Sequence, residues 1–152
     1  MYVLRVASAK AAMAVRQIAY RGLPQKPVLS ADTTVVFDGQ IVGKPEDAED
    51  AARILRTLSG REHQVLTAVA VALREQIEAQ ISVSSVLFRE LSDAEIRSYV
   101  ATGEPLDKAG AYAIQGRGGV LVTRMIGSYS GIMGLPLAET VELLQKFGIP
   151  TW

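Results

Sequence analysis

The chain of 152 residues contains no cysteine and a single histidine, His63. The absence of cysteine excludes disulfides, thiolate metal ligands and a cysteine nucleophile, and it fits a reducing compartment such as the cytoplasm. One histidine cannot by itself form a histidine-rich zinc centre. No apolar run approaches the roughly 20 residues of a membrane-spanning helix. These absences argue against a disulfide-stabilised, a zinc-centred or a membrane-spanning protein.

A net charge is absent as well, because Lys and Arg number 16 and Asp and Glu also number 16. There is no global positive field to attract DNA, RNA or an acidic membrane. A phosphate-bearing partner must therefore be held by a local cluster of cations, which suits a small nucleotide better than a polymer. The first 31 residues contain basic but no acidic residues. Mitochondrial targeting segments share that pattern, but the periodicity favours an integral helix.

The apolar residues follow strand and helix periodicities in alternation. Strands are expected over residues 28–37, 41–42, 65–73, 77–88, 111–114 and 120–126, with four helices before and between them and after the last one. Asp38-Gly39 predicts a hairpin turn, and Ser92 with Glu95 predicts a capping box at the third helix. We therefore predict one α/β domain over residues 1–152, with a mixed sheet flanked by helices.

Each expected helix has an apolar face that should meet the sheet. The residues predicted to face the core are, helix by helix, Leu4, Ala7, Ala11, Ala14 and Ile18; Ala51, Ile54, Leu55 and Leu58; Ile96, Tyr99 and Val100; and Leu137, Val141 and Leu144. Gly22, Gly60, Gly103 and Gly148 are placed to end these helices.

Asp32 is an acid inside a strongly apolar strand, in the run Ala31-Asp32-Thr33-Thr34. A carboxylate in such a position costs free energy unless it is paired, holds a metal or has a catalytic task. Two interpretations stay open: a general base or metal ligand, and a solvent-facing acid at the end of a strand. The motif alone favours neither.

Lys44 lies between Gly43 and Pro45, just before the second expected helix. An ammonium and free N–H groups in that position can hold a phosphate. A lysine in a surface turn is the simpler alternative, and on this motif alone it is favoured.

The densest polar cluster spans residues 103–119. Glu104, Asp107 and Lys108 lie in a glycine-bracketed loop, and a short strand then carries Gln115 into a glycine-rich turn. Glutamine has both a donor and an acceptor, which suits the edge of a nucleobase. The glycines would allow a ligand to approach the backbone closely. The turn matches neither a Walker A loop nor a dinucleotide fingerprint.

Other polar residues favour structural roles. His63 follows the end of a helix, where a surface or hydrogen-bonded histidine is more common than a catalytic one. Tyr112 and Tyr129 are expected to pack against neighbours. Ser128 and Ser130 lack the histidine partner of a serine nucleophile.

Taken in order, these motifs resemble the Maf family of nucleotide pyrophosphatases. The resemblance covers essentially the whole chain, and its most specific part is the block from Gly103 to Gly116. The other matching runs are Lys10-Ala11, Ala31-Asp32-Thr33, Gly43-Lys44-Pro45, Leu58-Ser59-Gly60, His63 to Ala68, Gly127-Ser128-Tyr129 and Gly134-Leu135-Pro136.

The resemblance implies a Maf/ITPase-like architecture and a cytoplasmic enzyme. Such an enzyme hydrolyses the α–β phosphoanhydride of nucleoside triphosphates with a divalent metal, Mg²⁺ or Mn²⁺. Gln115 in its I-Q-G context is similar to the branch that prefers dTTP and UTP. The implied roles are Asp32 as the acidic catalytic residue, Thr33 and Gln115 in base selection, Lys44 as a phosphate contact, and Asp107 and Lys108 as further substrate-binding residues.

Members of the family begin with a strand and an S-x-S-P-R-R-like loop that grips the phosphates, and this pattern does not precede Tyr2. We therefore expect a chain without that segment, whose exposed strand edge favours a homodimer. Two alternatives to an active pyrophosphatase stay open. One is a catalytically impaired nucleotide-binding or interaction protein on the same scaffold. The other is a structural partner in cell division, from the family's association with septum formation.

Overall fold

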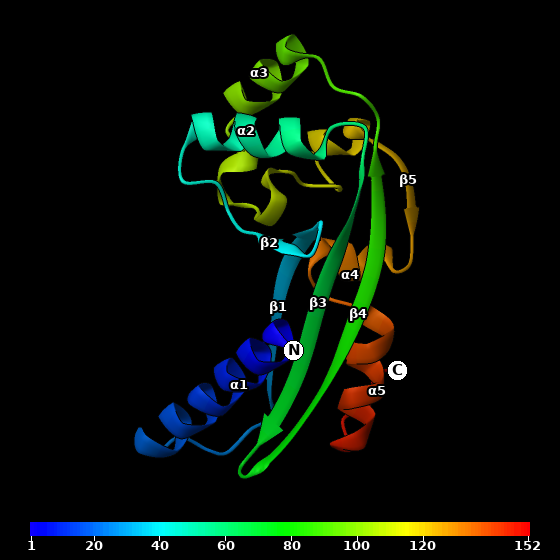
Figure 1. The fold of residues 1–152 in the computed structure, drawn as a ribbon. Coiled ribbons are helices and arrows are strands. Elements are labelled where there is room, and N and C mark those ends of the chain that lie inside the picture. Colours follow the sequence, from blue (N-terminus) through cyan, green and yellow to red (C-terminus); the bar gives the residue numbers. More distant parts are fainter.

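The computed structural model describes all 152 residues as an antiparallel sheet with helices on both faces (Figure 1). The sheet has the strand order β2-β1-β3-β4-β5. No helix combines the length and the apolar composition that crossing a membrane requires. In chain order the elements are α1 (Tyr2–Tyr20), β1 (Val28–Phe37), β2 (Gln40–Val42), α2 (Ala48–Leu58), β3 (Glu62–Leu73), β4 (Gln76–Phe88), α3 (Asp93–Ala101), the 3-10 turns η1 (Glu104–Asp107), η2 (Ala109–Ala111) and η3 (Arg117–Leu121), β5 (Val122–Ile126), α4 (Tyr129–Met133) and α5 (Leu137–Lys146).

The predicted α/β class with flanking helices is confirmed, but the sheet is antiparallel throughout and not mixed. The alternation of helices and strands suggested parallel crossovers. Instead, α2 connects β2 to β3, which lie on either side of β1 and do not pair with each other. The segment containing α3 returns the chain to β5, which runs antiparallel to its neighbour β4.

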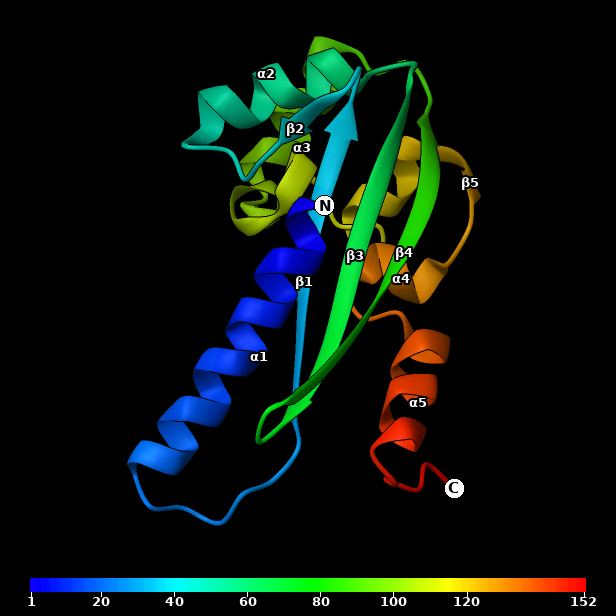
Figure 2. The ribbon, with the colours of Figure 1, turned by 60° about the horizontal axis from the view of Figure 1, so that its bottom comes forward.

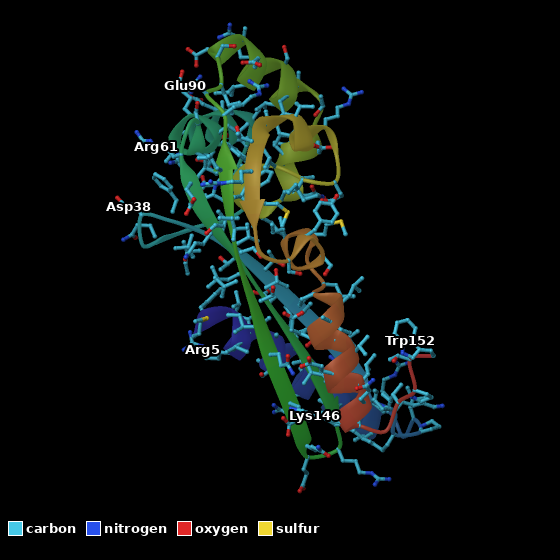
Figure 3. All side chains as sticks on the ribbon, turned by 90° about the vertical axis from the view of Figure 1, so that its right-hand side faces the viewer. Arg5, Asp38, Arg61, Glu90, Lys146 and Trp152 are labelled. Atoms are coloured by element: carbon cyan, nitrogen blue, oxygen red, sulfur yellow. The ribbon has the colours of Figure 1, made fainter.

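The first hairpin forms where it was predicted. Asp38 (φ 50) and Gly39 (φ 73) both have positive φ, as the two central residues of a type I′ turn do. Figure 3 shows Asp38 at the tip of this hairpin, away from the body of the molecule. The short β2 pairs with Val35–Phe37 only. The outer edge of β1 over residues 28–34 therefore has no neighbouring strand.

The lower half of the sheet is covered by one helix on each face (Figures 1 and 2). Alternate residues of β3 face the two helices, because side chains along a strand point to opposite faces. Ala68, Ala70 and Ala72 pack against α1, and Val69 and Val71 pack against α5. Small alanine side chains allow α1 to lie close to the sheet. The continuous apolar run of β3 is thus buried on both sides, as predicted.

The two terminal helices bury partly different residues from those predicted. The buried residues of α1 are Val3, Ala7, Ala11 and Val15, and those of α5 are Thr140 and Leu143. Leu137 is 57% exposed. The prediction for the first helix followed alternating steps of three and four residues. The buried row of α1 instead follows steps of four, and this row packs against the alanines of β3.

The upper half of the molecule contains the largest apolar core. Leu55 and Leu58 of α2, Phe88 of β4 and Ile96 of α3 meet there. The predicted capping box starts α3: Glu95 N donates to Ser92 Oγ (3.2 Å) and Ser92 N donates to Glu95 Oε2 (2.9 Å). Helices α2 and α3 share this apolar core with the upper end of the sheet (Figure 1).

The predicted strand over residues 111–114 is wrong. Gly110 (φ 72) and Ala111 (φ 61) interrupt any extended run, and Ala113 N donates to the Tyr99 hydroxyl (3.1 Å) instead of to a strand. The next strand begins at Val122, because η3 occupies the residues before it. The short helix α4 was not predicted. The irregular backbone over residues 104–121 places the side chains of Asp107, Lys108 and Gln115 along one cleft.

Candidate functional site

A cleft of about 300 Å³ is lined by seventeen residues from both halves of the molecule. Its size lies at the lower end of typical small-molecule sites, which span about 300–1,000 Å³. Lys10 of α1, Tyr112 and the end of α4 at Met133 and Gly134 also contribute to its wall. All the predicted site residues are among the lining residues: Asp32, Thr33, Lys44, Asp107, Lys108 and Gln115.

Asp32 is held by an ion pair within the cleft. Its Oδ1 lies 2.6 Å from Lys10 Nζ, and the Asp32 side chain is 18% exposed. The strand therefore tolerates the acid because an ammonium compensates its charge. Asp32 lies inside β1, so the interpretation as a solvent-facing acid at a strand end is wrong. Lys10 was not among the predicted site residues, and its match to the family's K-A pair was the signal that pointed to it.

Thr33 points to the opposite face from Asp32 and is part of a chain of hydroxyl groups. The buried Thr67 hydroxyl donates to Gly131 O (2.6 Å). Thr67 Oγ1 also lies 2.9 Å from Thr33 Oγ1, so Thr33 is the donor in that bond. Because the Thr33 hydroxyl hydrogen is used in this bond, the Thr33 oxygen can only accept a hydrogen bond from a ligand.

Lys44, Lys108 and Asp107 form the charged side of the cleft. Lys108 Nζ donates to Asp107 Oδ1 at 2.8 Å. This hydrogen bond and the charge of Lys108 lower the pKa of Asp107, with a smaller effect from the charge of Lys44. Lys10, Lys44 and Lys108 are the lysines of the cleft, against the carboxylates of Asp32 and Asp107. The site is therefore locally cationic in a chain of zero net charge.

The N-terminus of α2 adds acids rather than an anion site. Asp50 N donates to Asp47 Oδ1 (2.8 Å), and Glu46 N donates to Asp50 Oδ2 (3.1 Å). Only one of the two interpretations of the Lys44 motif required such amides to be open to a phosphate. Because carboxylates already occupy them, only the Lys44 ammonium of this motif faces the cleft.

The glycine-rich turn after Gln115 packs against the protein and not against an open space. A Cβ on Gly116 would lie 2.0 Å from Glu104 Oε1, and one on Gly118 would lie 2.6 Å from the Tyr99 hydroxyl. The expectation that these glycines let a ligand approach the backbone is therefore wrong. They make room for Glu104 and Tyr99.

Tyr112 lines the cleft and is supported from behind by His63. His63 Nε2 lies 2.8 Å from the Tyr112 hydroxyl, and His63 is only 2% exposed. Burial lowers the pKa of His63 to about 4 and raises the pKa of Tyr112. Both groups are therefore neutral near pH 7, which agrees with the predicted structural roles.

Comparison with known proteins finds similarity over almost the whole chain. A family model described as "Maf-like protein" matches residues 1–147. The dTTP/UTP pyrophosphatase of Aromatoleum aromaticum is 56% identical over 149 residues, which cover 98% of this chain and 72% of that protein. The proteins of the same name from Dechloromonas aromatica (56% identical, 97% and 73% covered) and Chromobacterium violaceum (54% identical, 97% and 74% covered) are similar over almost the same span.

Proposed function

This chain belongs to the Maf family, and we propose that it hydrolyses nucleoside triphosphates, preferably dTTP and UTP, to the monophosphate and pyrophosphate. One observation carries the proposal: residues from β1, from the loop after β2 and from the segment 107–115 line one cleft. A shared substrate would require that convergence. The names of the relatives support the choice of dTTP and UTP.

Asp32 is the base in this proposal. A water oxygen bonds to the α-phosphorus while the bond from that phosphorus to the bridging oxygen breaks, and the water loses a proton. The Asp32 carboxylate orients the water or accepts this proton, a contribution of about a hundredfold to ten-thousandfold. Lys10, 2.6 Å away, keeps the carboxylate oriented.

Lysines and a divalent cation screen the triphosphate in this proposal. Lys44 and Lys108 bind the departing pyrophosphate. The structure contains no group of three or more His, Asp or Glu side chains that could hold a metal. The carboxylates of Asp32 and Asp107 fit Mg²⁺ or Mn²⁺ that arrives with the nucleotide, because such ions are commonly held by one or two carboxylates and the substrate phosphates. When bound, the ion would act as a Lewis acid at phosphoryl oxygens.

Thr33 and Gln115 are the proposed contacts to the base. Thymine and uracil both present an N3–H donor beside carbonyl oxygens. The Thr33 oxygen, which can only accept, suits the N–H, and the Gln115 amide can donate to a carbonyl. Cytosine lacks a hydrogen at N3 and would leave Thr33 without a donor.

We also propose that residues 1–152 act as one domain in the cytoplasm, with a nucleotide and not a nucleic-acid polymer as the partner. The zero net charge supports a small anion held by local lysines. The unpaired edge of β1 over residues 28–34 supports a homodimer through that strand. A role in septum formation rests on the family resemblance alone and stays a prediction.

Pyrophosphate release from dTTP, UTP and GTP, with and without Mg²⁺ or Mn²⁺, tests the activity. We expect metal-dependent release that is faster from dTTP and UTP. Asp32→Asn should abolish turnover while nucleotide binding persists. The matched control is Asp38→Asn at the hairpin tip, where Asn also tolerates positive φ. Near-normal turnover of Asp32→Asn would contradict the role of Asp32. Binding without turnover in the unsubstituted chain would instead indicate the impaired nucleotide-binding protein.

A further inference from the structure

We propose that Glu104 is a positioning residue for base selection: it binds the backbone after Gln115 directly and the backbone before Gln115 through Tyr99, without lining the cleft itself. The inference rests on the proposed function, in which Gln115 contacts the base, and it assigns to Glu104 the positioning of Gln115. It concerns a carboxylate that the catalytic proposal does not use. Glu104 lies in η1, eleven positions before Gln115 in the chain.

The Glu104 carboxylate receives donors from two directions. Oε1 accepts from Arg117 N (2.9 Å), and Oε2 accepts from Gly118 N (2.9 Å) and from the Tyr99 hydroxyl. Partial burial opposes ionisation, but these hydrogen bonds together lower the pKa of Glu104. The carboxylate is therefore ionised near pH 7 and makes charge-assisted hydrogen bonds, which are stronger than neutral ones.

Tyr99 extends this contact to the other side of Gln115. Its hydroxyl donates to Glu104 and accepts from Ala113 N (3.1 Å). The backbone two residues before Gln115 is therefore bound by Tyr99, and the backbone two and three residues after it is bound by Glu104. The turn is closed between these points by Gly116 N donating to Ala113 O (3.1 Å).

The glycines of the turn leave space for this arrangement. A Cβ on Gly116 would meet Glu104 Oε1 at 2.0 Å, and a Cβ on Gly118 would meet the Tyr99 hydroxyl at 2.6 Å. A side chain at Gly116 would displace the Glu104 carboxylate, and one at Gly118 would displace the Tyr99 hydroxyl. The glycine-rich turn and Glu104 thus form one unit.

Gln115 depends on this unit because its own exposed side chain makes no hydrogen bond within the protein. The hydrogen bonds around it belong to its neighbours Ala113, Arg117 and Gly118. Gln115 lines the cleft, so the place of its amide follows the backbone turn. Loosening the turn should therefore affect the choice of base more than the chemistry at Asp32.

Glu104→Gln tests the inference, with Glu90→Gln as the control at an exposed acid outside the turn. We expect the ratio of kcat/KM for dTTP to that for GTP to fall about tenfold in Glu104→Gln. This is the size expected for one weakened charged hydrogen bond. The KM for dTTP should rise, while kcat with dTTP stays near the unsubstituted value. Equal losses for both substrates, or an unchanged ratio, would overturn the inference.

A second readout does not require activity. Amide hydrogen exchange at Arg117 and Gly118 should be faster in Glu104→Gln than in Glu90→Gln, because one amide then faces an NH2 group and the other keeps only a neutral acceptor. Unchanged exchange would overturn the inference even if the chain hydrolyses dTTP. Faster exchange in a chain without turnover would uphold the contact but contradict the proposed function. If Glu104→Gln does not fold, Tyr99→Phe should shift the selectivity ratio in the same direction, and no shift would overturn the inference.

Discussion

At the scale of single residues, His63 makes the stability of the fold depend on pH. Its imidazole is buried against Phe88 and Tyr112, and its Nδ1 has no hydrogen-bond partner. Burial lowers its pKa from the ordinary 6.5 to about 4. Between these values the unfolded chain binds a proton that the folded chain does not. The stability from this group is complete above about pH 6.5 and is lost as the pH falls towards 4.

We therefore predict that the free energy of unfolding falls by about 2 kcal/mol between about pH 7 and pH 5 through His63. Urea unfolding at several pH values measures it. In His63→Gln, which keeps a polar group beside Tyr112 but does not titrate, this part of the slope should vanish. Arg89 and Ser92 lower the pKa of Glu95 from its ordinary value of 4.5. The stability that Glu95 contributes therefore changes mainly below about pH 4.5, outside the range from pH 7 to pH 5. Equal slopes in the two proteins would contradict the prediction.

Gln115 should decide between bases at the same scale. Gln115→Glu removes the amide donor and adds a charge in the cleft, so we predict a lower ratio of dTTP to GTP hydrolysis, by about tenfold. Pyrophosphate release from each nucleotide measures the ratio. Gln145→Glu on the exposed side of α5 is the matched control. If the ratio were the same in both variants, Gln115 would have only a structural role.

At the scale of elements, α3 depends on its first turn. Ser92 caps the helix through the reciprocal bonds with Glu95. Ser92→Ala should lower the free energy of unfolding by about 1 kcal/mol, because a helix-end amide loses its acceptor. Denaturant unfolding measures the loss. Ser98→Ala, at an exposed position within the same helix, should change stability by less than about 0.5 kcal/mol. Similar losses in the two variants would show that the cap is not the cause.

At the scale of the whole molecule, the packing of α1 against the sheet affects both the stability of the fold and the position of Lys10 in the cleft. Ala70 is fully buried beneath α1, which also carries Lys10. Ala70→Leu should lower the free energy of unfolding by about 1–3 kcal/mol through overpacking. It should also reduce turnover, because a displaced α1 moves Lys10 away from Asp32.

Urea unfolding and kcat/KM for dTTP measure the two effects in the same samples. Ala9→Leu adds the same atoms on the exposed side of α1 and should leave both values nearly unchanged. A destabilised Ala70→Leu protein with full turnover would show that the packing of α1 against the sheet does not determine turnover.

The sequence by itself determined those features that depend on neighbours along the chain. The strand over residues 28–37, the Asp38-Gly39 turn and the Ser92 capping box follow from local backbone preferences and short-range hydrogen bonds. The resemblance of ordered motifs also named six residues that the fold gathers into one cleft. In the proposed function these motifs mark the residues that a shared substrate contacts, whatever elements lie between them.

Only the tertiary structure decided which distant residues touch. Lys10 and Asp32 are 22 positions apart, and His63 and Tyr112 are 49 apart. No periodicity along the chain specifies such pairs. The same reason explains the wrong strand at residues 111–114: local apolar character favoured extension there. Tyr99, 14 positions before Ala113, instead binds its amide and with Glu104 shapes the turn around Gln115. A buried backbone amide must have a hydrogen-bond acceptor, and the tertiary packing determines which acceptor lies within reach.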